Sequence, residues 1–198
     1  MTRAREDAVR ECAFGDLTPP YATIVADPPW HYDARPVGGG KPGTMGKAKP
    51  FPYSTMTIEE IRALPVGDLA GPHCVLWLWT TNKWLRESFT VLDAWGFTYK
   101  QTLVWGKNNP MPVGSVAPSA AEFLIAAKRG NPQMQWVWPS SVIVTARPSA
   151  RAHSVKPDCF RDYIEAASPA PYVELFCRTP RIGWDSWGKG FEAQREAS

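Results

Sequence analysis

Several common signatures are missing from this chain of 198 residues. No apolar run approaches the roughly 20 residues that a helix needs to cross a bilayer. The mixed-charge start, Met1 to Glu11, has no apolar stretch typical of a signal peptide, so we expect a cytoplasmic protein. A glycine-rich G-x-G-x-x-G loop is absent, which disfavours a dinucleotide oxidoreductase. A nucleophile elbow is absent as well, which disfavours a hydrolase.

The few cysteines and histidines form no metal-ligating pattern. None of the four cysteines stands in a C-x-x-C pair, and the three histidines show no ligand spacing. We therefore expect neither a zinc site nor a disulfide framework. Cys74 and Cys177 lie in apolar runs, which predicts that they are buried free thiols.

Charge and composition limit the class of protein only loosely. The net charge of +3 permits a nucleic-acid partner without arguing for one. Hydrophobic residues make up 44% of the chain and charged residues 21%, as in an ordinary globular domain. Ten tryptophans and twenty prolines are the unusual feature. Flat rings on loops can stack on bases, but for most of the ten we expect a place in the core.

Short apolar runs alternate with amphipathic segments along the chain. Such runs predict strands that are buried on both faces of a sheet. They are Tyr21–Ala26, Cys74–Thr80, Thr98–Trp105, Glu122–Ala127, Val142–Thr145 and Tyr172–Cys177. The alternation predicts an α/β fold with a mostly parallel sheet and helices on both faces. Sheets of this kind bind ligands at the carboxyl ends of their strands.

Three segments carry helix signals. They are Thr57–Leu64, Asn82–Trp95 and Pro157–Ala167. Thr57 and Glu60 form the T-x-x-E capping box that begins the first. Leu85, Phe89 and Leu92 form one apolar stripe on the second, and a glycine follows its end. The third has proline at its first position.

Two long basic loops follow predicted strands. Residues 31–52 are rich in glycine and lysine, and residues 145–156 carry Arg147, Arg151 and Lys156. Loops longer than about 12 residues in a compact domain are usually functional or disordered. Each loop alone suits a solvated surface equally well. Together with the motif described next, they favour active-site loops.

Asp27-Pro28-Pro29-Trp30 directly follows the first predicted strand. A rigid turn is one interpretation, and the other is alkylation of an aromatic amine. The lone pair of such an amine is delocalised into the ring, and two acceptors placed around the nitrogen would localise it. The Asp27 carboxylate and the Pro28 carbonyl can supply them, because prolines hold the turn stiff. Trp30 or a loop aromatic can stack on the base, which in a duplex would first be flipped out.

The whole segment from about residue 20 to 190 resembles the MT-A family of adenine methyltransferases. The matching stretches include YATIVADPPW, PYSTMTIEEIRALPV, VLWLWTTNKWL, HSVKPDCFRDYIEAASP and ELFCRTPRIGWDSWG. The resemblance implies one Rossmann-like methyltransferase domain over residues 1–198, with residues 1–15 as an N-terminal extension. It also implies a permuted order, in which the catalytic strand precedes the cofactor strand. The implied donor is S-adenosylmethionine, and the implied acceptor is the N(6) amine of adenine in nucleic acid.

The resemblance also implies roles for single residues. Asp27, Pro28, Pro29 and Trp30 would form the catalytic motif, and Tyr53 and Lys156 would contact the acceptor adenine. The implied cofactor-binding residues are Asp27, Pro28, Lys156, Leu175, Phe176, Arg178, Arg181 and Lys189. No metal is implied. We expect DNA rather than RNA as the substrate, with sequence selectivity supplied by a homodimer or a partner subunit.

The sequence departs from the family pattern near its end. Trp187-Gly188-Lys189-Gly190 stands where relatives commonly have W-G-N-E or G-N-Q. A lysine donates hydrogen bonds but cannot accept them as an amide does. This leaves a second hypothesis, a catalytically silent nucleic-acid-binding relative that serves as a partner subunit. The intact DPPW motif weighs against it. Methylation of another amine, such as that of cytosine, is a third and weaker reading.

Overall fold

The computed structural model describes residues 14–15, 17–32, 55–111, 116–148 and 155–188 of the chain. The helices in these ranges are α2 (Ile58–Ala63), α3 (Val66–Leu69), α4 (Leu85–Trp95) and α5 (Asp158–Ala167). The strands are β1 (Tyr21–Ala26), β2 (Ala70–Thr80), β3 (Thr98–Met111), β4 (Ser119–Arg129), β5 (Val142–Thr145), β6 (Tyr172–Leu175) and β7 (Trp184–Trp187). No helix in the described ranges is both long enough and apolar enough to cross a membrane.

All seven described strands form one sheet in the order β5-β3-β4-β2-β1-β6-β7. β1 is parallel to β2 and β6, β7 is parallel to β6, and β5 is parallel to β3. β4 is antiparallel to both of its neighbours, β2 and β3. Among the described strands, β4 is thus the one that runs against the rest. The prediction of a mostly parallel α/β sheet is confirmed. The carboxyl ends of six strands share an edge with the first residues of β4.

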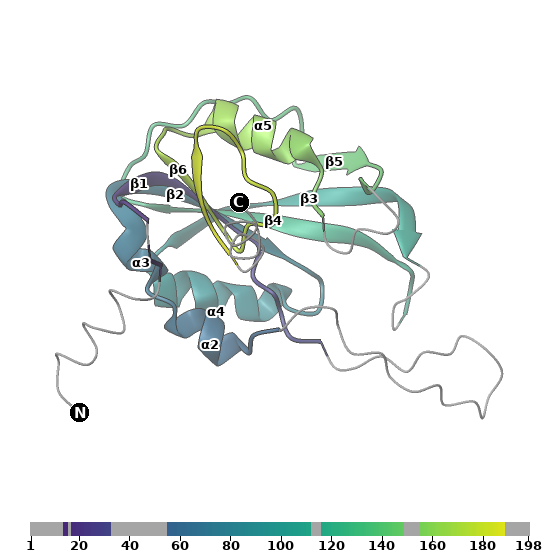
Figure 1. The fold of residues 1–198 in the computed structure, drawn as a ribbon. Coiled ribbons are helices and arrows are strands. Elements are labelled where there is room, and N and C mark those ends of the chain that lie inside the picture. Colours follow the sequence, from purple (N-terminus) through teal and green to yellow (C-terminus); the bar gives the residue numbers. More distant parts are fainter. Residues whose placement is uncertain (1–13, 16, 33–54, 112–115, 149–154, 189–198) are drawn as a thin grey trace, which may run out of the picture.

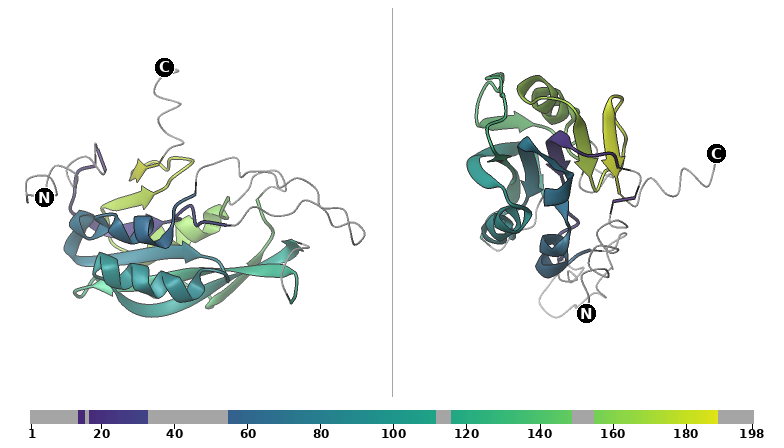
Figure 2. Two further views of the ribbon diagram at one scale, coloured as in Figure 1. Left: turned by 90° about the horizontal axis from the view of Figure 1, so that it is seen from below. Right: turned by 90° about the vertical axis from the view of Figure 1, so that its left-hand side faces the viewer.

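Both faces of the sheet are buried, which explains the continuous apolar runs in the sequence. Successive residues of a strand point to opposite faces, so Leu76 of β2 joins one core and Trp77 joins the other. Figures 1 and 2 show α5 over one face and α2 and α4 over the other. Ile61, Val91, Leu92 and Trp95 bring α2 and α4 into the first core, and Phe160, Ile164 and Ala167 bring α5 into the second.

The helix signals in the sequence are largely confirmed. Thr57 caps α2, and its reciprocal hydrogen bonds with Glu60 complete the capping box. Gly96 ends α4 in the left-handed conformation with a φ of 77°. The expected stripe on α4 was wrong at Phe89, whose ring is 37% exposed and packs on Tyr99. The buried face is formed instead by Ser88, Val91, Leu92 and Trp95.

The strand boundaries depart from the apolar runs in five of the described strands, and β2 begins at Ala70 rather than at the predicted Cys74. β3 and β4 extend beyond their predicted ends because their antiparallel ladder continues to the pair Met111 and Ser119. The predicted strand Tyr172–Cys177 ends at Leu175 because Phe176 has a φ of 62°, a left-handed conformation that a strand cannot continue. β7 was missed, since its four residues carry only a weak apolar pattern and pair with β6 at the sheet edge.

Candidate active site

The DPPW turn follows β1 and is tied to two other parts of the chain. The amide of Asp27 lies 3.5 Å from the carbonyl oxygen of Leu175, at the end of β6. The amide of Trp30 donates to the Pro28 carbonyl at 2.8 Å, and the amide of Met56 donates to the Pro29 carbonyl at 2.8 Å. The turn is therefore held by backbone hydrogen bonds, and it places Asp27 next to the end of the neighbouring strand.

Trp30 anchors this turn from within the core. Its side chain is 4% exposed, and its indole N–H donates to the Trp79 carbonyl at 3.1 Å. Its ring stacks on Trp84 with 6.4 Å between the ring centroids. Both contacts and burial hold the Trp30 ring inside the protein, and stacking of Trp30 or a loop aromatic on the target base stays a prediction. Trp30 thereby fixes the backbone on either side of the prolines.

Asp27 stands at one end of a chain of four alternating charges. The ammonium of Lys156, just before α5, lies 2.6 Å from Oδ2 of Asp27 and 3.3 Å from Oε2 of Glu122. The other oxygen of Glu122, Oε1, lies 2.5 Å from the ammonium of Lys107. The side chains of these four residues are between 7% and 24% exposed. The order is thus Asp27, Lys156, Glu122 and Lys107, with opposite charges in contact throughout.

Glu122 and Lys107 reach this site because of the direction of β4. Glu122 lies near the start of β4 and pairs with Trp105 of β3. Since β4 runs against its neighbours, its first residues lie at the edge where the other strands end. Lys107 follows Trp105 by two residues and therefore points to the same face of β3. Charged residues from three strands and one loop thus meet at a single edge.

Two tryptophan rings form one wall of the charge network. The Lys156 ammonium lies 5.3 Å from the ring centroid of Trp79, and the Lys107 ammonium lies 4.8 Å from that of Trp105. The two rings meet edge to face at 6.3 Å and belong to the core under α5. Each lysine therefore has a carboxylate on one side and an indole face on the other, and a cation over an indole face is attracted by the ring. Tryptophan in this chain thus serves mostly the core, as expected.

Burial and pairing set the titration of these groups. Burial raises the pKa of Asp27, and the nearby Lys156 offsets part of that rise. Burial also acts against the charged form of Lys156, but Asp27 and Glu122 outweigh it and raise the pKa of Lys156 to about 12. Glu122 is buried too, yet Lys156 and Lys107 lower its pKa below the ordinary value. Lys156 and Glu122 are therefore charged at neutral pH, and Asp27 is the member most sensitive to acid.

The segment after β6 adjoins Asp27 on the other side. Leu175 is buried at the end of the strand, Phe176 is half-buried, and Arg178 is exposed. The positive charge of Arg178 acts to lower the pKa of Asp27, against the larger effect of burial, which raises it. The Cys177 amide donates to the Trp187 carbonyl at 2.9 Å. A Cβ on Gly188 would lie 2.6 Å from the Cys177 carbonyl oxygen, so the close approach of these two segments requires glycine.

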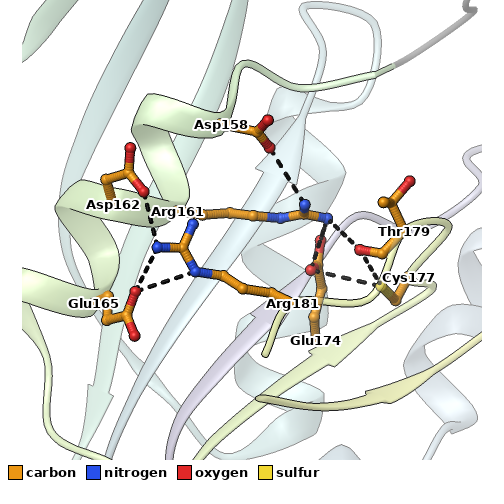
Figure 3. A network of polar contacts seen from close by, with 8 residues as sticks. All are labelled: Asp158, Arg161, Asp162, Glu165, Glu174, Cys177, Thr179 and Arg181. Carbon is orange, nitrogen blue, oxygen red and sulfur yellow. Dashed lines mark hydrogen bonds and ion pairs between the residues drawn. The ribbon is translucent and has the colours of Figure 1, made fainter. Parts of the chain in front are cut away.

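A second set of ion pairs fastens this segment to α5 (Figure 3). Arg161 of α5 contacts Glu174 of β6 at 2.9 Å and donates to the Thr179 carbonyl at 3.2 Å. Arg181 contacts Asp162 at 2.8 Å and Glu165 at 2.5 Å, both on α5. An open hollow of about 460 Å³ lies between the helix and this segment. It is lined by Asp158, Arg161, Glu165, Thr179, Pro180, Arg181 and Ile182, and Asp27 is not among them.

The predicted site residues divide into three groups. The structure brings Asp27 and Lys156 into contact and places the carbonyl of Leu175 beside the Asp27 amide, with Phe176 and Arg178 in the segment that follows Leu175. Arg181 is engaged by carboxylates of α5. Tyr53 and Lys189 lie outside the described residues, as do most of the loop 31–52 and part of the loop 145–156. Cys74 and Cys177 are buried free thiols, as predicted.

Sequence reasoning missed Glu122 and Lys107. One signal was available, since both are charged residues adjoining apolar strand sequences, VW-G-K and E-FLIAA. A charge in such a place costs free energy unless it is paired. Within the described ranges, no three His, Cys, Asp or Glu side chains lie close enough together to hold a metal ion.

The residues present fit S-adenosylmethionine. The exposed side chain of Arg178 suits the carboxylate of an amino acid, and the half-buried Phe176 beside the backbone of Leu175 suits an adenosine face. Asp27 supplies a carboxylate at the same edge, next to the amide and carbonyl groups of the turn. Parallel α/β sheets bind their ligands at this edge.

Comparison with known proteins agrees with this geometry. Residues 21–190 match the family model MT-A70. The chain is 31% identical over 183 residues to "Type II methyltransferase M.MunI" of a Mycoplasma species, covering 85% of this chain and 76% of that protein. It is 26% identical to the N(6)-adenosine-methyltransferase MT-A70-like of Arabidopsis thaliana and to the human N(6)-adenosine-methyltransferase catalytic subunit METTL3. Those two alignments cover 91% and 82% of this chain but only 25% and 26% of the relatives.

The single α/β sheet and the carboxylate–lysine pair after an inner strand define a Rossmann-like methyltransferase. The chain belongs to the MT-A70 family, whose model covers most of its length. The family resemblance and the prediction of a methyltransferase are confirmed. The expected order is present as well, because the DPPW strand β1 precedes β6 in the sequence and lies beside it in the sheet.

Proposed function

We propose that this chain transfers a methyl group from S-adenosylmethionine to the exocyclic N(6) amine of adenine in nucleic acid, with DNA as the preferred polymer. The observation that carries the proposal is the Asp27 carboxylate, held 2.6 Å from Lys156 at the end of β1 and beside the end of β6. Relatives named N(6)-adenosine-methyltransferases support adenine N(6) as the acceptor.

Asp27 acts on the amine by accepting a hydrogen bond. Lys156 holds Oδ2 of Asp27, so we assign Oδ1 to the amine. The Pro28 carbonyl is the second acceptor. It already accepts the Trp30 amide at 2.8 Å, but a carbonyl oxygen has two lone pairs and can accept a second bond. Two acceptors that draw the N–H groups out of the ring plane leave the nitrogen lone pair localised and nucleophilic.

The arrangement works through preorganisation more than through strong base catalysis. The anionic Asp27 also favours the positive charge that grows on the nitrogen as the new bond forms. Lys156 keeps the carboxylate in one orientation. The pKa of Lys156, raised to about 12 by its two carboxylate partners after the opposing effect of burial, means that it does so as a cation at neutral pH.

The donor is assigned to the edge formed by β1 and β6. When bound, S-adenosylmethionine supplies an electrophilic methyl group. Arg178 would bind its carboxylate, and Phe176 and the backbone of Leu175 would line its adenosine, together with Asp27, Pro28 and Lys156 along the edge. We assign Arg181 the indirect role of holding this segment on α5, in accord with its two ion pairs. Tyr53 as a contact of the acceptor base and Lys189 as a contact of the donor stay predictions.

The choice of DNA as the polymer rests on how much of each relative the chain covers. The chain spans 76% of a relative named a type II methyltransferase, but only about a quarter of the N(6)-adenosine-methyltransferases named above. The human relative is named a catalytic subunit, which supports a partner subunit or a second copy of this chain as the source of sequence selectivity.

The test is transfer of a labelled methyl group to adenine-containing DNA and RNA oligonucleotides, both single- and double-stranded. The matched control is the same oligonucleotide with purine, which lacks the amine, in place of adenine. We expect label in DNA and none in the purine control. Label in neither polymer would refute the substrate class, and equal label in the control would refute N(6) as the acceptor. Calorimetry with the donor alone separates a silent relative, which would bind none at millimolar concentration, from an enzyme that lacks its true polymer.

A further inference from the structure

Lys107 takes part in the site without touching the residues of the DPPW turn. Its ammonium contacts Oε1 of Glu122, whereas Lys156 contacts Oε2. The two oxygens of one carboxylate thus have separate cationic partners on opposite sides. The Lys107 side chain is 7% exposed and that of Glu122 is 13% exposed, so this pair lies inside the protein and is not a surface ion pair.

We propose that Lys107 is a positioning residue for the acceptor site: it fixes Glu122, which fixes Lys156, which holds the carboxylate of Asp27 toward the target amine. The inference rests on the proposed function, because Asp27 matters here as the acceptor of the amine. The chain of contacts crosses from β3 to β4, to the segment before α5, and to the end of β1. Three sheet strands therefore contribute to the placement of one carboxylate.

Charge balance gives the physical reason why Lys107 is needed as the fourth residue of the charge network. Without Lys107, two buried carboxylates would share the single ammonium of Lys156, and one negative charge would be left without a partner. An unpartnered charge of this kind is costly inside a protein. Glu122 would then compete with Asp27 for Lys156. With Lys107 present, each carboxylate has an adjacent cation, and the short contact of Lys156 is the one to Asp27, at 2.6 Å rather than 3.3 Å.

A purely structural role is the competing explanation. Lys107 could simply join β3 to β4 and lie over the Trp105 ring, which it does at 4.8 Å. The two explanations differ in what happens at Asp27, because only an electrostatic chain transmits the loss of Lys107 that far. The titratable and charged groups that act on Asp27 from the surrounding elements are Lys156, Glu122, Arg178, Glu174 and Tyr32.

The test follows the titration of the Asp27 carboxyl by carbon NMR in protein labelled at aspartate, with the signal assigned from Asp27→Asn. Lys107→Met leaves a net negative charge near Asp27, so its titration should move to higher pH by on the order of 0.5–1 unit. Glu122→Gln, which is nearly isosteric, leaves a net positive charge and should move it to lower pH. The double variant should fall between the two, and Lys107→Arg should restore the wild-type value.

Lys100→Met is the matched control, since Lys100 is an exposed lysine on the same strand and its loss changes the net charge equally. We expect it to leave the Asp27 titration in place. Equal shifts in Lys107→Met and Lys100→Met, or no shift in either Lys107→Met or Glu122→Gln, would overturn the proposal. Because the measurement uses the protein alone, it stands even if no oligonucleotide is labelled. Where transfer is detected, Lys107→Met should lower kcat about tenfold with little change in KM.

Discussion

Two polar networks of similar chemistry lie on either side of the segment after β6, and they differ in burial. The inner network joins Asp27, Lys156, Glu122 and Lys107, and none of these side chains is more than 24% exposed. In the outer network, which centres on Arg161 and Arg181, the carboxylates of Asp158 and Asp162 are 84% and 64% exposed, whereas its pair of Arg161 and Glu174, at 20% and 12%, is as buried as the inner network. Figure 3 shows that the outer network lies between α5 and the loop that follows β6.

Burial changes what an ion pair does for a protein. Exposed pairs contribute about 0–1 kcal/mol each and serve mainly to hold segments together. Buried charges cost several kcal/mol to desolvate, so a fold that keeps four of them together bears a cost that simple packing would avoid. The inner network is therefore the part of the molecule for which a functional reason is needed, and the outer network is explained by attachment of the loop to the helix.

The largest expected effect is on methyl transfer by Asp27→Ala. Removing the carboxylate removes the main acceptor of the amine, and we expect a loss of on the order of 10³-fold or more, as for other preorganised electrostatic groups. Asp27→Asn keeps the shape and should lose nearly as much, because the amide has a weaker acceptor. The measurement is the rate of labelled methyl transfer, and activity near wild type in both variants would contradict the assigned role.

Asp27→Asn should leave the folded protein as stable as the wild type. Burial raises the pKa of Asp27. At neutral pH the charged carboxylate therefore has a higher free energy in the folded protein than in the unfolded chain, which lowers the stability of the fold. Asp27→Asn removes that cost, while Lys156 keeps Glu122 as a partner at 3.3 Å. We expect the thermal unfolding midpoint to stay equal or rise slightly. A clear fall would mean that Asp27 is structural and would weaken the contrast between the networks.

Lys156→Met should have the largest effect on stability. It leaves the carboxylates of Asp27 and Glu122 facing one another without the cation between them. Loss of one partner from a buried pair typically costs about 3–5 kcal/mol, which denaturant unfolding would measure. Adding Glu122→Gln should recover part of that loss by removing one of the two charges. If Lys156→Met cost less than 1 kcal/mol, the inner network would be no different in kind from the outer one.

The position of Asp27 and the ends of the helices could be predicted from the sequence, whereas the position of Glu122 could not. Asp27 could be found because a charged residue directly after an apolar strand in an α/β pattern lies at the ligand-binding edge. The capping box at Thr57 and the left-handed Gly96 could be found because their signals are local. Glu122 could not be placed at the site, because it stands at the start of its predicted strand and apolar periodicity does not reveal strand direction. Only the antiparallel pairing of β4 brings its start to the site.

Alkaline pH should reveal the contribution of Lys156 to the inner network. The pKa of Lys156 is raised to about 12 from an ordinary 10.5, so its contribution to stability is complete below pH 10.5 and is lost as pH rises through 12. Glu122 behaves in the opposite sense: its lowered pKa means that its contribution holds above pH 4.5 and is lost as pH falls below that value. Unfolding midpoints between pH 10 and 12 should fall in the wild type faster than in Lys156→Met, in which this group is missing. If the unfolding midpoints of the two proteins fell in parallel with pH, the result would contradict the pairing of Lys156 with Asp27 and Glu122.

The smallest effect is expected in the outer network, from Arg181→Ala. Its size distinguishes Arg181 as an attachment of the loop to α5 from Arg181 as a direct ligand of the cofactor. The Arg181 guanidinium is bound to Asp162 and Glu165, which are exposed on α5. Arg181→Ala should therefore cost about 0.2–1 kcal/mol of stability and raise the donor Kd only a few fold, by loosening the loop. Arg161→Ala should cost more, because Arg161 pairs with Glu174, whose side chain is 12% exposed. Calorimetry with the donor measures the difference: a tenfold or greater rise in Kd for Arg181→Ala with unchanged stability would instead make Arg181 a direct ligand of the cofactor.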